Sequence, residues 1–363
     1  MRNSGSSPEP QKIRLTGAPG LDWLLLAVVA AIVLDVLGGS PLWIFIFSAL
    51  GLIPLAAVLG ATTDQLANRM GPLAAGVLQS TLGNASELIL ALAALNAGLL
   101  EVVKASLTGS IISNLLLVLG FSMLLGGLKF ERQTVNKTVA ASNATMLFLA
   151  AVGLVVPAVF SLAVYGGLGA EHPSLENLSL WTAGILIIMY GLSLYFQLRA
   201  ARVSGRTRAV GRRRGPALQM SIAVILTAVL SELLVRELQT AQAAFHGTDL
   251  FWGGVIFALI GNAAEHGVAV MAARRNEMDL AMAIGVGSSL QIALLLAPAL
   301  VFISLWFGHP MSLVFTGIEV AAVVLSTVMV GMIAADGETN WLEGAQLIAV
   351  YAILAAGFYF MPL

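Results

Sequence analysis

Long apolar runs follow one another along most of this chain, separated by glycine, proline or charged residues. A helix needs about 20 apolar residues to cross the hydrocarbon core of a bilayer. The runs predict eleven transmembrane helices, over residues 21–38, 41–66, 72–98, 103–127, 137–160, 178–198, 217–240, 250–273, 279–306, 312–334 and 341–361. We therefore expect an all-α, polytopic membrane protein in which no separate soluble domain finds room.

Composition supports this class. Hydrophobic residues make up 58% of the chain and charged residues 10%, whereas soluble proteins carry about 25% charged residues. The absence of cysteine excludes disulfides and thiolate metal ligands. The polar residues before Leu21 show no convincing cleavage site, so the first apolar run is expected to be a retained helix.

Basic residues are concentrated at alternate ends of the predicted helices. If the N-terminus is cytoplasmic, the basic segments at 12–14, 129–137, 199–214 and 274–275 all lie on the cytoplasmic side, and only Lys104 and Arg236 lie near outer ends. By the positive-inside rule, this predicts a cytoplasmic segment 1–20 and an external C-terminus. The expected location is a prokaryotic inner membrane.

The largest polar interruption, residues 199–216, is rich in arginine. We interpret it as a flexible cytoplasmic linker that contacts anionic lipid of the bilayer. Nucleic-acid binding is the rival interpretation of an arginine cluster, but a short tract between two spans more often reports topology, so no nucleic-acid partner is expected.

An internal repeat divides the chain. The segment GVLQSTLGNASELILAL around Glu87 aligns without a gap with GVIFALIGNAAEHGVAV around Glu265, 178 positions later. The same offset places Gly109 on Gly287. Two units of five helices, residues 41–198 and 217–363, would have opposite orientations because five is an odd number. The predicted fold is therefore one N-terminal helix followed by two inverted five-helix repeats, an arrangement typical of transporters that bind substrate at the midplane.

The repeated motif places an acidic residue inside each of two apolar spans. Glu87 and Glu265 both lie near the middle of their predicted helices. A charged side chain facing lipid there costs roughly 2.5 to 3.5 kcal/mol, so both are expected to face the protein interior. Asn84 and Asn262 precede them by three positions, which places amide and carboxylate on the same helical face.

Small and polar residues surround these positions. Gly83 and Gly261 are expected to open a helical turn and free backbone carbonyls, which lipid tolerates only where they line a cavity. The expected supporting residues on the facing helices are Ser110, Ser113, Ser288 and Gln291. Carboxylate, amide, hydroxyl and carbonyl oxygens without sulfur favour a hard cation such as calcium.

Further titratable residues extend this hypothesis. His266 points about 100° away from Glu265 around the helix, which disfavours a shared zinc site. A proton relay or gate and a packing histidine both remain open for it. Glu232 and Glu319 lie inside predicted spans, where they either extend a proton path or pair with a neighbour.

Charge balance suggests a mechanism. Two protonated glutamates and two ionised glutamates holding one divalent cation carry the same net charge, whereas the empty pair of anions is costly to bury. Either loaded state could therefore cross between inward and outward access. Protons and the cation compete for the glutamates in this scheme. A third proton on His266 would make the exchange electrogenic. No resident cofactor is expected.

At these motifs the chain resembles the calcium/cation antiporter superfamily, in its calcium/proton exchanger branch. The matching pieces are LQSTLGNASELILAL from Leu78, KASLTGSIISNLLLVLG from Lys104, GNAAEHGVAV from Gly261, GVGSSLQIALLLAP from Gly285 and NWLEGAQLIAVYAI from Asn340. The resemblance implies proton-driven calcium export, with calcium bound by Glu87 and Glu265 and with His266 in the family's histidine position. Two features depart from the family pattern: Thr63 replaces an acid, and the linker is basic.

Other functions remain to be tested. Sodium or potassium exchange against protons on the same scaffold is the closest alternative. An intramembrane hydrolase is disfavoured because the chain has neither an HExxH nor a GxGD motif. A passive channel also remains open as an alternative function. The protein is expected to be a transporter and not an enzyme. A homo-oligomer is possible from the sequence.

Overall fold

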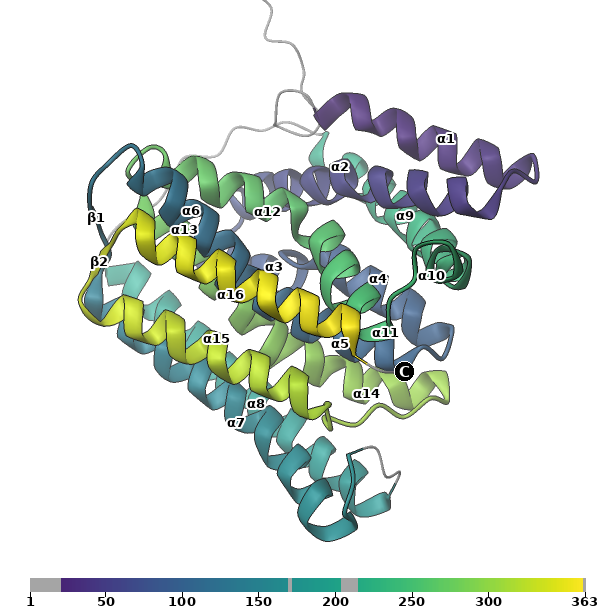
Figure 1. The fold of residues 1–363 in the computed structure, drawn as a ribbon. Helices are drawn as coiled ribbons and strands as arrows, with labels where there is room; N and C mark the ends of the chain where they lie inside the picture. Colours follow the sequence, from purple (N-terminus) through teal and green to yellow (C-terminus); the bar gives the residue numbers. More distant parts are fainter. Residues whose placement is uncertain (1–20, 169–171, 204–214, 362–363) are drawn as a thin grey trace, which may run out of the picture.

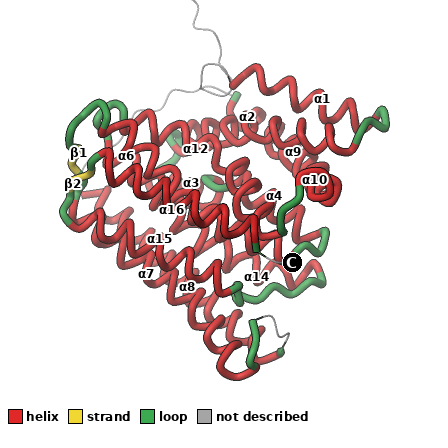
Figure 2. The backbone as a smooth tube through the Cα atoms, in the orientation of Figure 1, coloured by secondary structure: helices red, strands yellow, loops and turns green. Residues whose placement is uncertain are grey.

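The computed structural model describes residues 21–168, 172–203 and 215–361. The described chain is almost entirely helical, with a single pair of two-residue strands (Figure 2). The expectation of an all-α membrane architecture is confirmed. The predicted cytoplasmic segment 1–20 and most of the predicted linker, residues 204–214, lie outside the described residues.

The elements before the linker are η1 (Leu21–Leu24), α1 (Leu25–Val36), α2 (Pro41–Ala67), α3 (Pro72–Leu82), α4 (Ala85–Asn96), α5 (Leu100–Ile112), η2 (Ser113–Val118), α6 (Leu119–Gly127), β1 (Gln133–Thr134), α7 (Lys137–Tyr165) and α8 (Pro173–Val203). Those after it are α9 (Pro216–Arg236), α10 (Leu238–Phe245), α11 (Asp249–Phe251), η3 (Trp252–Phe257), α12 (Ala258–Ala273), α13 (Met278–Gln291), η4 (Ile292–Leu296), α14 (Ala297–Phe307), α15 (Gly317–Ala335), β2 (Glu338–Thr339) and α16 (Trp341–Phe360). Helix α8 thus extends past the predicted start of the linker at residue 199.

The number of membrane-crossing helices differs from the prediction. Within the described residues, 9 helices are long and apolar enough to cross a membrane, and Ala85–Asn96 is a shorter apolar helix. The predicted first span is reduced to the 12 residues of α1 after a short 3-10 turn. The predicted third span is divided into α3 and α4. The count of eleven is therefore not confirmed.

The helices pack in pairs that join the two halves of the chain (Figure 1). Helix α2 packs along α9, and α7 along α15. Helix α16 packs on α6, and α14 packs on α8. At the centre, α5 crosses η3 and α12 packs against α13. Asn84, Glu87 and Asn262, within the two repeated motifs, are buried in this bundle.

A small clasp fixes one end of α12. Strand β1 pairs antiparallel with β2, which joins the loops before α7 and before α16. Within this clasp, buried Gln133 donates from Nε2 to the carbonyl of Ala273 over 2.8 Å, and Lys129 donates to the carbonyl of Arg274 over 2.9 Å. These bonds satisfy carbonyls that the last turn of a helix leaves free.

Three wider π-helical turns interrupt the central helices. Segments η2 (Ser113–Val118) and η4 (Ile292–Leu296) occupy equivalent places in the two repeats. Segment η3 (Trp252–Phe257) has no π-helical counterpart, because the equivalent part of the first repeat is the regular helix α3. Such π-bulges occur frequently at functional sites.

Candidate ion-binding site

Glu87 lies in the first turn of α4, just after a break in the helix. Helix α3 ends at Leu82 and α4 begins at Ala85, with Asn84 at φ −103° and ψ 39° between them. The opened turn expected at Gly83 is confirmed. A helix N-terminus carries a partial positive charge, which stabilises a carboxylate placed in its first turn. The break therefore provides a favourable setting for Glu87, which is only 8% exposed.

Gly261 allows α4 to approach α12. A Cβ at Gly261 would lie 3.2 Å from Cγ of Glu87, tighter than an ordinary contact. The Ser86 hydroxyl lies 3.0 Å from Oε2 of Glu87 and 3.2 Å from the carbonyl oxygen of Gly261. The opened turn expected at Gly261 is wrong, because α12 is a regular helix from Ala258 to Ala273. Here glycine provides space for the opposing glutamate instead of breaking its own helix.

Glu265 and His266 lie one turn further along α12. Both residues are half-buried. Oε2 of Glu265 and Nε2 of His266 are covered, and neither has a hydrogen-bond partner among the described residues. Glu265 follows, by one helical turn of α12, the Gly261 that packs against Glu87. The structure thus brings one acid from each repeat to a common region with unused hydrogen-bonding capacity.

Asn84 is held at the helix break by residues of α13. Its Nδ2 donates to Oε1 of Gln291 over 2.7 Å, and its Oδ1 accepts from the Ser288 hydroxyl over 2.7 Å. Asn84 is 4% exposed. Both ends of the amide are therefore fixed by the second repeat.

Asn262 is held in a corresponding way by the first repeat. Its Nδ2 donates to the Ser110 hydroxyl over 2.9 Å and to the carbonyl of Ala258 over 2.8 Å. Its Oδ1 accepts from Nδ2 of Asn114 over 3.1 Å, and Asn114 also donates to the Ser288 hydroxyl over 3.1 Å. The predicted residues Asn84, Asn262, Ser110, Ser288 and Gln291 thus belong to one continuous buried polar network.

Asn114 joins the two ends of this network, and sequence reasoning missed it. It is fully buried, and its Oδ1 has no hydrogen-bond partner within the described part of the chain. The position equivalent to Asn114 in the second repeat is Ile292, so a comparison of the repeats gives no sign of it. The signal that could have found it is a polar amide side chain inside an apolar predicted span, directly before the run LLLVLG.

Two other predicted residues have different surroundings. Ser113 is buried beside the network and donates to the carbonyl of Ser110 over 3.3 Å. Glu232 is exposed on α9, four positions before that helix ends at Arg236, and the structure does not bring it to the other site residues. Thr63, which replaces the family's acid, is 2% exposed.

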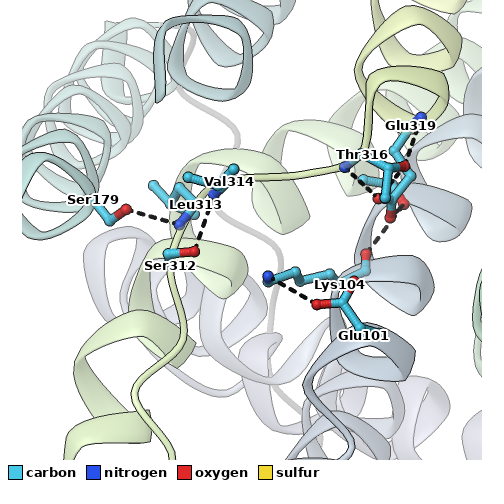
Figure 3. Close-up of polar contacts among 9 residues, drawn as sticks. Glu101, Lys104, Ser179, Ser312, Leu313, Val314, Thr316 and Glu319 are labelled. Atoms are coloured by element: carbon cyan, nitrogen blue, oxygen red, sulfur yellow. Dashed lines mark hydrogen bonds and ion pairs between the residues drawn. The ribbon is translucent and has the colours of Figure 1, made fainter. Parts of the chain in front are cut away.

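Glu319 belongs to a separate polar cluster (Figure 3). Its Oε1 accepts from the Thr108 hydroxyl over 2.9 Å, and its Oε2 accepts from the backbone nitrogen and the hydroxyl of Thr316 over 2.9 and 2.7 Å. Thr316 and Glu319 form a capping box at the start of α15. Nearby, Lys104 pairs with Glu101 over 3.2 Å. These contacts tie α5 to α15 and satisfy both oxygens of the buried acid.

A small cavity borders Glu87. Its lining residues are Glu87, Leu90, Ser106, Leu107, Ser110, Phe257, Ile292 and Leu296. Among the described residues, no group of three or more His, Cys, Asp or Glu side chains is placed to hold a metal ion. A cation at this site would therefore need neutral oxygens in addition to two carboxylates.

The fold is that of a membrane exchanger. The sodium/calcium exchanger protein family matches residues 40–199 and 216–360, and the chain belongs to that family. The resemblance to its calcium/proton exchanger branch, predicted from the motifs, is confirmed.

Among curated relatives, the Ca(2+)/H(+) antiporter of Synechocystis is 41% identical, over 90% of this chain and 93% of the relative. The Ca(2+)/H(+) antiporter ChaA of Bacillus subtilis is 39% identical, over 93% and 98%. Among solved structures, native YfkE has a TM-score of 0.83 and 38% identity, over 94% of this chain and 100% of that chain. The relatives are transporters, which agrees with the predicted class.

Proposed function

We propose that this protein exchanges cytoplasmic calcium for external protons by alternating access, and that Glu87 and Glu265 bind either the calcium ion or the protons. The observation that supports this proposal is the packing of Glu87, from one repeat, against the helix that carries Glu265, from the other, beside a buried amide and hydroxyl network. Relatives at about 40% identity are named Ca(2+)/H(+) antiporters, which supports calcium and protons as the exchanged ions.

The chemistry of competition follows from the charge of the pair. Burying two ionised carboxylates next to each other without a partner is costly. One divalent cation or two protons would remove that cost equally well. Each loaded form could therefore be occluded, whereas the empty dianion would stay accessible to water. This difference would couple calcium movement to proton movement in the opposite direction.

The neutral oxygens of the site would complete the calcium shell. Calcium takes 6 to 8 oxygen ligands at about 2.3 to 2.6 Å. We assign this role to the side chains of Asn84 and Asn262 and to carbonyls near Gly83 and Gly261. The Ser86 hydroxyl now occupies the space between Glu87 and the Gly261 carbonyl, so calcium binding would require it to rotate away.

His266 would set the proton stoichiometry. Its Nε2 is covered and unpartnered within the described residues, on the helix that carries Glu265. Two protons per calcium would make the exchange electroneutral, and a third proton on His266 would make it electrogenic. Replacement of His266 by Gln would then change the voltage dependence of exchange without removing calcium binding.

The function is tested by ion flux in proteoliposomes that contain the purified full chain. An imposed proton gradient should drive calcium uptake, and added calcium should release protons. Flux of sodium or potassium with protons, without calcium flux, would overturn the proposal in favour of the monovalent exchanger. Calcium flux that ignores the proton gradient would overturn it in favour of a channel.

A further inference from the structure

The backbones of α5 and η3 touch at a crossing of small residues. We call this set, Ala105 and Gly109 on α5 with Gly253 and Gly254 on η3, the α5–η3 seal. A Cβ on Gly109 would overlap the backbone of Gly254, and a Cβ on Gly253 would lie 2.8 Å from Cβ of Ala105. Such contact leaves no passage between the two helices.

The positions equivalent to this set by the repeat are also small, with Ala75 in place of Gly253, but they lie apart. The offset of 178 positions gives Ala283 and Gly287 on α13 and Ala75 and Gly76 on α3. A Cβ on Gly287 would meet no atom within 4 Å, and Ala283 is exposed. A Cβ on Gly76 would instead meet Leu198 of α8, at 2.9 Å.

In both halves, the helix that carries these glycines also packs against the last helix of its own repeat. A Cβ on Gly254 would lie 3.4 Å from the Phe358 ring of α16, as one on Gly76 would meet Leu198 of α8. Helix α16 ends the second repeat as α8 ends the first. The difference therefore lies between α3 and α13, because a Cβ on Gly287 meets no atom within 4 Å and the atoms nearest to one on Gly76 belong to α8. Accordingly, most of η3 is buried, whereas none of the described side chains of α3 is.

We propose that these two sets are alternating seals, and we call the set on α3 and α13 the second seal. The structure is closed at the α5–η3 seal and open at its counterpart, which under the predicted topology leaves the site open toward the cytoplasm. In the opposite state, Ala75 packs on Ala283 and Gly76 on Gly287, while the α5–η3 seal separates. This inference rests on the proposed alternating access and names the residues that perform it.

A methyl group at Gly287 tests the opposite state, in which the second seal is closed. It fits without contact in the present structure, but it would collide with α3 when the second seal closes. Gly287→Ala should therefore fold normally and lose exchange at least about tenfold, since overpacking of this kind commonly shifts an equilibrium by that much. The matched control is Gly184→Ala on α8, where a Cβ also meets no atom within 4 Å. Equal exchange rates in the two variants would overturn the inference.

A cysteine pair tests the closed contact directly. The chain has 0 cysteines, so Ala75→Cys/Ala283→Cys introduces the only two thiols. At the closed α5–η3 seal the counterpart Cβ positions would be only 2.8 Å apart. Ala75 carries a Cβ where Gly253 has none, so the contact between Ala75 and Ala283 must be slightly wider, near the roughly 3.5 to 4.5 Å between Cβ atoms that a disulfide needs. Under mild oxidation in membranes, we expect a cross-link, read as loss of maleimide labelling, that stops exchange and is reversed by reductant.

Absence of the cross-link, or unchanged exchange in the cross-linked protein, would overturn the inference. The two proposals fail in different ways. A wild-type chain that moves no calcium would refute the proposed function, yet the thiol assay would still report whether the second seal closes.

Discussion

Gly261→Ala places a methyl group against the glutamate of the opposite repeat. The added Cβ would lie 3.2 Å from Cγ and 3.5 Å from Cδ of Glu87. Glu87 would have to move by a few tenths of an ångström, although Ser86 holds its Oε2 at 3.0 Å. Overpacking costs about 1 to 3 kcal/mol, partly offset by the 0.5 to 1 kcal/mol that alanine gains over glycine within a helix. The free energy of unfolding should therefore fall by about 0 to 2.5 kcal/mol.

Calcium binding should change more than stability, because the displaced group is a proposed ligand. If the strain falls on the bound state, the apparent KM for calcium should rise about 5- to 150-fold. The assay is proton-driven calcium uptake over a calcium titration in proteoliposomes. Gly267→Ala on the same helix is the control, since a Cβ there meets no atom within 4 Å. Indistinguishable calcium titrations for the two variants would refute the placement of Glu87 against Gly261.

Three further changes test other contacts. Asn114→Leu removes the donor to Asn262 and Ser288, so exchange should fall sharply and unfolding stability by about 1 to 3 kcal/mol; normal exchange would show that the network is dispensable. Glu319→Leu removes both acceptors of its cluster, so the melting temperature should fall while the exchange rate per folded molecule stays constant; a specific loss of exchange would instead indicate a proton path. Asp35→Asn weakens an exposed ion pair with Arg236, so the free energy of unfolding should change by no more than about 1 kcal/mol, measured by thermal unfolding.

Much of the site was predictable because the chain repeats itself. The duplicated motif identified Glu87 and Glu265, and the cost of charge in lipid required both to face inward. Glycine before an asparagine predicted the break at Gly83. At Gly261 the same reasoning failed, because the role of a glycine depends on which residue packs against it. That information belongs to the tertiary structure.

The remaining differences have similar causes. The repeat comparison hid Asn114, whose counterpart is Ile292. The prediction of Glu232 used its position along the span but not the direction of its side chain, and the structure places it on an exposed face. The lengths of α1 and α3 and the π-helical turns depend on how neighbouring helices pack, which apolar runs alone do not specify.

The central claim is that calcium and protons compete for two acids, one from each repeat. The most direct test is calcium-dependent proton movement in liposomes that contain wild-type protein, Glu87→Gln or Glu265→Gln. Our account predicts coupled exchange in the wild type and its loss in both variants, each still folded by thermal unfolding. Coupled exchange that persists in either variant would contradict it.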